Sequence, residues 1–124
     1  MKTNPVCWFE LYVQDMARAR AFYESVLRTR FSRLESPSGL DMLAFPRTAE
    51  GAGAPGALVR MEGVESGGSG TLVYFECEDC AIELGRVEAA GGKIERGKTS
   101  LGPHGFMALA LDTEGNRFGL YSMR

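Results

Sequence analysis

The chain has little of what marks several common classes of protein. Its 124 residues contain three cysteines, one histidine and one tryptophan, with no block of basic residues and a net charge of −2. Nucleic acid and anionic membranes are therefore not expected as partners. A small, odd number of cysteines predicts free thiols in a reducing cytoplasm rather than a disulfide framework.

Long apolar segments are missing as well. No run approaches the roughly 18 apolar residues of a membrane span, so no transmembrane helix is expected. Residues 1–5 lack the apolar core of a signal peptide, which again favours a cytoplasmic protein. With 44% hydrophobic and 24% charged residues, the composition predicts one globular domain of this length, or two small modules sharing a core.

The most informative feature that is present is an internal repeat. A strand-like segment, Trp8 to Asp15, precedes a helical pattern, and a similar segment, Leu72 to Asp79, does so 64 residues later. A duplicated unit of this kind usually builds its site between the copies. We predict a single domain over residues 1–124, with modules at 1–62 and 71–124 joined by a Gly- and Ser-rich linker at 63–70.

Both modules are predicted to have the order β-α-β-β-β. In the first, Asp15 caps a helix with one apolar stripe, and the strands are at 6–13, 30–35, 40–45 and 57–61. A turn is expected at 36–39 and a loop at 48–56. In the second, Asp79 caps a helix that Gly91 and Gly92 end, and the strands are at 71–77, 93–96, 105–111 and 117–123. A tight turn at 112–116 joins the last two strands. The fold class is α+β.

These motifs resemble the glyoxalase/bleomycin-resistance/extradiol-dioxygenase superfamily, also called vicinal oxygen chelate proteins. The first module matches through WFEL-x-V-x-D-x-x-RA-x-x-FY, from Trp8 to Tyr23. The second matches through YFE at 74–76, GG at 91–92, GPHGF at 102–106 and DTEGN at 112–116. The resemblance implies two βαβββ modules forming a curved mixed sheet with a cleft, commonly in a homodimer. One departure is Arg28, where the family usually has glycine after the first helix.

The usual metal ligands of the superfamily are a second departure. The resemblance places them at Trp8, at Leu72 and at Gly119, and none of these side chains can coordinate a divalent cation. The fourth position, on the strand at 57–61, is not aligned, and Arg60 is the polar residue there. No cofactor is therefore expected, and a divalent metal is disfavoured. A cation held by displaced ligands, such as Glu10, Glu76 and His104, is the alternative.

Two carboxylates are the main candidates for chemistry. Strand alternation puts Glu10 on one face with Trp8 and Tyr12, and Glu76 on one face with Leu72 and Tyr74. If Phe9, Leu11 and Val13 lie under the helix, Glu10 faces the cleft, where a carboxylate serves as a general base or holds a ligand donor group. The other interpretation pairs each carboxylate with an arginine such as Arg60 or Arg117.

The remaining candidates are aromatic rings and thiols. Trp8, Tyr12, Tyr74 and Tyr121 would suit a planar or apolar ligand, or simply fill the cleft or a dimer seam. Cys77 and Cys80 match C-x-x-C, but flanking acids and too few ligands favour buried packing over redox or zinc chemistry. An exposed loop position is expected for His104.

The function predicted from these observations is binding of a small molecule without the superfamily's usual metal, in a resistance or sequestering role. The predicted ligand-binding residues are Trp8, Glu10, Tyr12, Arg60, Tyr74, Glu76 and Tyr121, with Glu10 also the candidate catalytic residue. The alternative is a metal-dependent lyase, isomerase or dioxygenase that uses an unusual ligand set on a small oxygenated substrate.

Overall fold

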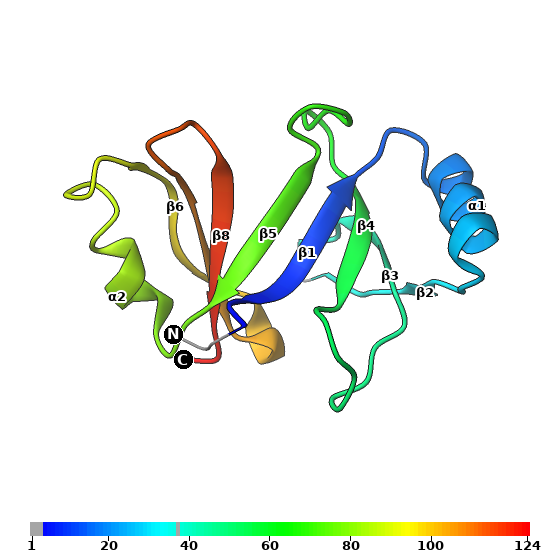
Figure 1. The fold of residues 1–124 in the computed structure, drawn as a ribbon, viewed down its shortest axis with the longest axis horizontal. Coiled ribbons are helices and arrows are strands. Elements are labelled where there is room, and N and C mark those ends of the chain that lie inside the picture. The colour runs from blue at the N-terminus through cyan, green and yellow to red at the C-terminus, as the bar shows by residue number, and fades with distance from the viewer. Residues whose placement is uncertain (1–3, 37) are drawn as a thin grey trace. The chain divides into compact units, whose positions relative to one another are not determined.

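The computed structural model describes residues 4–36 and 38–124, which form two compact units. One unit is Trp8–Thr71, and the other is Leu72–Arg124 together with the chain up to Cys7. The elements are β1 (Val6–Tyr12), α1 (Met16–Leu27), β2 (Ser32–Arg33), β3 (Asp41–Ala44), β4 (Gly56–Arg60), β5 (Thr71–Glu76), α2 (Cys80–Leu84), β6 (Lys93–Ser100), β7 (Phe106–Leu111) and β8 (Arg117–Ser122), with a 3-10 turn at Gly102–His104 (Figure 1). This order confirms the α+β class and the repeated β-α-β-β-β plan.

The strands of the Trp8–Thr71 unit lie in the order β2-β3-β4-β1. Strand β1 is parallel to β4, and the other neighbours are antiparallel. Helix α1 covers one face, where Leu11 and Val13 pack in a cluster around buried Phe31, Leu43 and Leu58. Leu11 and Val13, with Phe9 against Phe45, therefore lie on the helix side, which was the condition for Glu10 to face the other way.

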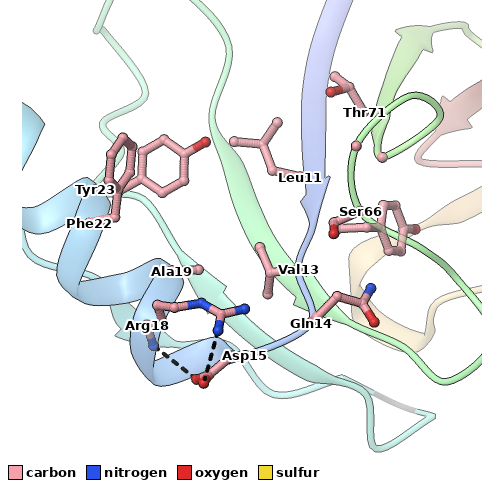
Figure 2. A pocket seen from close by; sticks show the side chains of 13 residues that line it. Leu11, Val13, Gln14, Asp15, Arg18, Ala19, Phe22, Tyr23, Ser66 and Thr71 are labelled. Atoms are coloured by element: carbon pink, nitrogen blue, oxygen red, sulfur yellow. Dashed lines mark hydrogen bonds and ion pairs between the residues drawn. The ribbon is translucent and has the colours of Figure 1, made fainter.

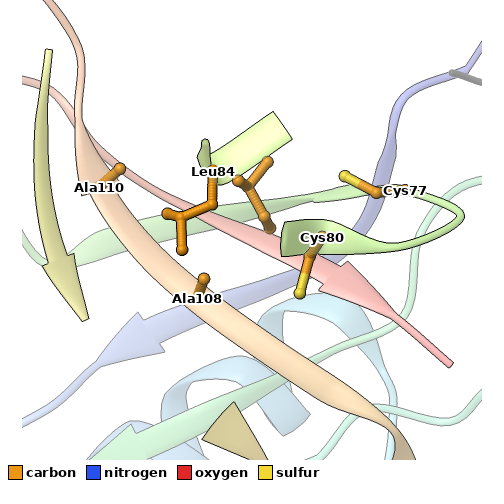
Figure 3. Packing of buried hydrophobic residues seen from close by; sticks show 6 residues of the cluster. Cys77, Cys80, Leu84, Ala108 and Ala110 are labelled. Atoms are coloured by element: carbon orange, nitrogen blue, oxygen red, sulfur yellow. The ribbon is translucent and has the colours of Figure 1, made fainter. Parts of the chain in front are cut away.

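The other unit repeats this plan with the order β5-β8-β7-β6. Strand β5 is parallel to β8, and β7 is antiparallel to both β8 and β6. Helix α2 covers one face, over the buried residues Cys77, Cys80, Leu84, Ala108, Ala110 and Leu120 (Figure 3). The start of β1 also joins this unit, because the amide of Glu76 donates to the carbonyl of Pro5 at 2.9 Å.

Helix α1 buries less than its apolar stripe predicts. Asp15 caps it as expected, accepting from the amide of Arg18 at 3.0 Å. Of the stripe, only Ala19 and Tyr23 pack on the sheet; Phe22 and Val26 are each 59% exposed and Leu27 is 55% exposed. The helix is turned so that Met16, Ala19 and Tyr23 face inward, which leaves the i, i+4 row of Phe22 and Val26 along its side.

The end of α1 is strained at Arg28, the residue that stands where the superfamily usually has glycine. Arg28 adopts the left-handed conformation (φ 50°, ψ 50°), and its amide donates to the carbonyl of Glu24. This conformation is strained for an L-residue, because its Cβ comes too close to the following carbonyl oxygen. Glycine has no Cβ and adopts the conformation without strain.

Arg28→Gly is therefore expected to raise the free energy of unfolding by about 0.5–1 kcal/mol. Urea unfolding followed by circular dichroism measures the change. Arg30→Gly is the control, because Arg30 is an exposed arginine nearby without positive φ and should gain nothing. Equal effects at both positions would contradict the left-handed cap as the cause.

Three element boundaries differ from their predictions. Helix α2 ends at Leu84 instead of near Gly91, because Gly85 weakens the helix and the next amides, of Arg86 and Val87, bond three residues back. Strand β6 runs on to Ser100, since register shifts on either side of Arg96 accommodate Gly97 within a strand. Strand β2 pairs only at Ser32–Arg33, as an edge strand with β3 as its sole neighbour.

The predicted flexible linker is held in place. The amide of Tyr12 donates to the carbonyl of Gly70 at 2.7 Å, and Nε2 of Gln14 donates to the carbonyl of Val64 at 3.1 Å. Residues 63–70 therefore pack against the end of β1 as part of the first unit. The turn predicted at 36–39 is present, with the amide of Gly39 bonded to the carbonyl of Ser36, while Pro37 lies outside the described residues. Neither α-helix in the described chain has the length and apolar character needed to cross a bilayer.

Candidate functional site

The face of β1 turned away from α1 carries a connected group of one carboxylate and two aromatic side chains. The indole nitrogen of Trp8 donates to Oε2 of Glu10 at 3.0 Å, and the hydroxyl of Tyr12 donates to Oε1 at 2.7 Å. Glu10 is only 8% exposed. These two donors, one on each oxygen, help to fix the orientation of the carboxylate.

The surroundings of this group follow from strand register. Glu10 lies opposite Ala57 and Tyr12 opposite Val59 on parallel β4. Trp8 and Tyr12 pack with buried Met42, Ala57 and Val59, in a cluster that Leu34 and Leu40 complete. The face therefore places one buried carboxyl group among apolar and aromatic side chains, and Trp8, Glu10 and Tyr12 share that face as the alternation predicted.

In the second unit, the face of β5 turned away from α2 carries Tyr74 and Glu76. Phe75 and Cys77 point to the α2 side, which leaves the alternate residues on the opposite side. Glu76 lies opposite Tyr121 of β8, so the structure brings Tyr74, Glu76 and Tyr121 onto one sheet face. The hydroxyl of Tyr121 donates to the carbonyl of His104 and lies 3.0 Å from the sulfur of Met123.

A glycine faces an aromatic ring in each unit, on the face away from α2 in one and on the α1 side of β1 in the other. Gly119 lies opposite Tyr74, and a Cβ at position 119 would lie 2.2 Å from the Tyr74 ring. Gly56 lies opposite Phe9, and a Cβ there would lie 2.5 Å from that ring. In both units, the ring fills the space that a side chain on the neighbouring strand would occupy.

The two arginines considered as partners of the carboxylates lie elsewhere. Arg60 alternates onto the α1 side of β4, where its Nε donates to the carbonyl of Gln14 at 3.1 Å. It is therefore not brought to the face of Trp8, Glu10 and Tyr12, although the sequence grouped it with them. Arg117 pairs with Glu95 at 2.8 Å rather than with either predicted carboxylate. His104 is exposed in the 3-10 turn, as expected.

The residues at the usual metal positions do not fit a metal ion. The Trp8 nitrogen is a hydrogen-bond donor that points at Glu10, Leu72 is a buried hydrocarbon, and the space beside Gly119 holds the Tyr74 ring. Among residues 4–36 and 38–124, no three His, Cys, Asp or Glu side chains gather closely enough for a displaced site. No chemical step is therefore derived through a cation.

The C-x-x-C residues pack as apolar groups. Cys77 and Cys80 are 7% and 0% exposed within the α2 core, and all three cysteines are free. The amide of Cys80 donates to the hydroxyl of buried Ser122 at 3.0 Å. Burial, reinforced by the negative charge of Glu83, raises the pKa of Cys77 to about 11. The structure confirms the packing interpretation for these two positions.

Thiol labelling measures the consequence. With a pKa of about 11, about one Cys77 thiol in a thousand is ionised at pH 8, and only the thiolate reacts. Native protein should therefore show one faster thiol, from half-buried Cys7, and two slow ones with Ellman's reagent at this pH. Cys7→Ser should remove the faster phase alone. Rapid reaction of all three thiols in folded protein would contradict the buried placement.

The sequence interpretation missed the residues that surround the carboxylate from other strands. Met42 and Val59 form the apolar floor beside Trp8 and Tyr12. The alternation of residues along β3 and β4 indicates which side chains share a face. It does not indicate which of them lie opposite Trp8 and Tyr12, because that depends on the register of these strands against β1. A cavity on the α1 side of β1 was also missed, because the apolar stripe of α1 suggested that this side of the helix packs on the sheet.

Comparison with known proteins agrees with this architecture. Residues 6–120 match the sequence model of the Glyoxalase/Bleomycin resistance protein/Dioxygenase superfamily. A search of curated protein sequences found no significant match.

Similar solved structures include methylmalonyl-CoA epimerase from Streptomyces coelicolor in complex with 2-nitronate-propionyl-CoA (TM-score 0.70, 15% identity, 95% of this chain and 96% of that one). The Mycobacterium tuberculosis epimerase (0.67, 13%, 100% and 93%) and a hypothetical protein from Bacillus halodurans (0.73, 13%, 99% and 96%) are also similar. At these identities the likeness is one of fold. With the family match over residues 6–120, it shows that the chain belongs to the glyoxalase/bleomycin resistance protein/dioxygenase superfamily.

Proposed function

We propose that this protein binds a small organic molecule on the sheet face of Trp8, Glu10 and Tyr12. The observation that carries the proposal is the buried Glu10 carboxylate, held by one donor on each oxygen and surrounded by apolar side chains. Binding sites for small molecules commonly combine apolar and aromatic walls with a few fixed polar groups. The rings of Trp8 and Tyr12 would contact an apolar or aromatic ligand, and Glu10 would anchor a hydroxyl or amine group on it.

The anchoring role is preferred to a catalytic one. The two donors preset the orientation of the Glu10 carboxylate, so a ligand does not have to order it on binding. A proton-transfer role for Glu10 stays a prediction, as do the ligand-binding roles of Tyr74, Glu76, Tyr121 and Arg60. A resistance or sequestering protein needs binding alone.

The single tryptophan provides the test. Trp8 donates directly to Glu10, so a ligand on this face should change its emission, and a panel of small aromatic alcohols and amines can be titrated while it is recorded. Glu10→Gln keeps the size but removes the charge and should weaken binding about tenfold. Glu50→Gln, at an exposed loop position, is the matched control. The proposal fails if no ligand changes the emission, or if both variants bind as the original protein does.

We also propose that this site works without a divalent cation. The support is the chemistry of Trp8, whose indole nitrogen donates a hydrogen bond to Glu10 and cannot act as a metal ligand. Protein purified without chelator should contain no stoichiometric metal by elemental mass spectrometry, and its melting temperature should not change with chelator or added cations. Stoichiometric metal with a chelator-sensitive melting temperature would overturn this proposal and favour the lyase, isomerase or dioxygenase alternative.

The oligomeric state and the cellular location are proposed from other observations. A homodimer is proposed because members of the superfamily commonly form one, and sedimentation velocity measures it directly. A cytoplasmic location is proposed because the three cysteines are free thiols. Fractionation of the source cells tests the location independently of ligand binding.

A further inference from the structure

The α1 side of the Trp8–Thr71 unit has a cavity of about 500 Å³, separate from the face of Glu10. Its walls are the helix-facing side of β1, the first half of α1 and the segment 66–71 (Figure 2). The apolar lining consists of Leu11, Val13, Ala19, Phe22 and the ring of Tyr23. Its volume lies within the range typical of small-molecule sites, about 300–1,000 Å³.

The wall opposite the helix is formed before any ligand arrives. Hydrogen bonds from the backbone of Tyr12 to Gly70 and from the side chain of Gln14 to Val64 hold this segment at the end of β1. A turn bond from the amide of Gly70 to the carbonyl of Gly67, at 2.6 Å, closes the segment on itself. Such preorganisation lowers the entropic cost of binding.

The helix wall presents an aromatic pair to this cavity. Phe22 and Tyr23 meet edge to face, with ring centroids 5.1 Å apart, and Phe22 remains 59% exposed. The Tyr23 hydroxyl points toward Leu11 across the cavity (Figure 2). It makes no hydrogen bond with any residue in the described part of the chain, although tyrosine hydroxyls at half-buried positions usually find a partner.

A cation lies at the rim. Arg18 lines the cavity, its side chain is 76% exposed, and its guanidinium approaches Asp15 only at 3.9 Å. Such an exposed ion pair contributes little to the free energy of unfolding, and the Asp15 carboxylate already accepts a hydrogen bond from the backbone amide of Arg18. The guanidinium therefore keeps donors for a carboxylate, which it binds in a planar, two-point geometry.

We propose that this cavity binds a small aromatic carboxylate. The ring lies against Leu11, Val13 and Phe22, and the carboxylate accepts hydrogen bonds from Arg18. The Tyr23 hydroxyl adds a donor from the cavity wall. This site is distinct from that of the proposed function, because Trp8 and Glu10 point their side chains to the opposite face of β1 and do not line the cavity, although Tyr12, at the end of the strand, does.

Naphthoate is a suitable probe, with neutral naphthamide as its isosteric control, and calorimetric titration at fixed salt measures both. Naphthoate should bind saturably, and naphthamide at least about tenfold more weakly, as expected for loss of a charge-assisted pair. Arg18→Gln should weaken naphthoate about tenfold and abolish the preference over naphthamide, while Phe22→Ala should weaken both probes. Tyr23→Phe should weaken naphthoate severalfold.

Two variants separate this site from its alternatives. Val26→Ala removes an equally exposed apolar side chain from the same helix outside the cavity, and Glu10→Gln alters the other face; both should bind naphthoate normally. The proposal is overturned if naphthoate does not bind saturably, or if Arg18→Gln has no effect. It is also overturned if Phe22→Ala and Val26→Ala weaken binding equally, or if both dissociate a dimer, because the helix face would then be an interface between copies.

Discussion

Gly119→Ala is expected to lower the free energy of unfolding by about 1–3 kcal/mol, as overpacking of a buried site does. The added methyl would lie 2.2 Å from the Tyr74 ring, well inside contact distance. Tyr74 is 8% exposed, so its ring is closely surrounded and the added methyl would have to displace packed atoms. The cost is steric, since the backbone of Gly119 does not adopt a positive φ.

Urea unfolding in two backgrounds tests this cause. In a Tyr74→Ala background the ring is gone, and Gly119→Ala should then cost less than about 0.5 kcal/mol. Gly97→Ala is the matched control, because it lies in strand β6 with open space around its Cβ and no positive φ. A loss of stability that is the same with and without the Tyr74 ring would refute the steric explanation.

Glu10→Ala is expected to lower the free energy of unfolding by about 2–4 kcal/mol. The variant removes the Glu10 oxygens that accept hydrogen bonds from the indole N–H of Trp8 and from the hydroxyl of Tyr12, in a buried and largely apolar surrounding. Glu10→Gln retains an acceptor oxygen and should cost about 1 kcal/mol. Glu50→Ala removes an exposed carboxylate and should change stability by less than about 0.5 kcal/mol.

A double-mutant cycle with Tyr12→Phe isolates one of the two bonds. If the hydroxyl donates to Glu10 as the 2.7 Å distance indicates, the two variants should couple by about 1–2 kcal/mol. Independent effects, which simply add, would mean that the carboxylate is held by other groups. The cycle is measured with chemical denaturant at one fixed pH for all four proteins.

Sequence reasoning succeeded where one local pattern decided the outcome. Alternation along a single strand placed Trp8, Glu10 and Tyr12 on one face, and the two aspartates capped their helices. It also gave the repeated plan, since strand and helix order follow from periodicity. These features depend on neighbours within a few residues.

The failures depend on contacts between distant segments. Arg60 was grouped with Glu10, but the register of β4 places it on the α1 side. The linker looked flexible by composition, yet hydrogen bonds from the end of β1 hold it. Gly97 looked like the end of a strand, yet irregular pairing with β7 carries β6 through it. The register between two strands cannot be predicted from the composition of either strand alone, because it depends on contacts between distant segments.

The close fit between Gly119 and Tyr74 has an evolutionary consequence. The resemblance implies that metal-dependent relatives often carry a glutamate ligand at this position, and a glutamate here would need more than a change at 119. A glutamate introduced first would collide with the Tyr74 ring. Selection would remove this destabilised intermediate before it gained any benefit from binding a cation. The ring has to shrink first, at a step that brings no benefit of its own. The order of substitutions that could place a carboxylate at position 119 is thus constrained.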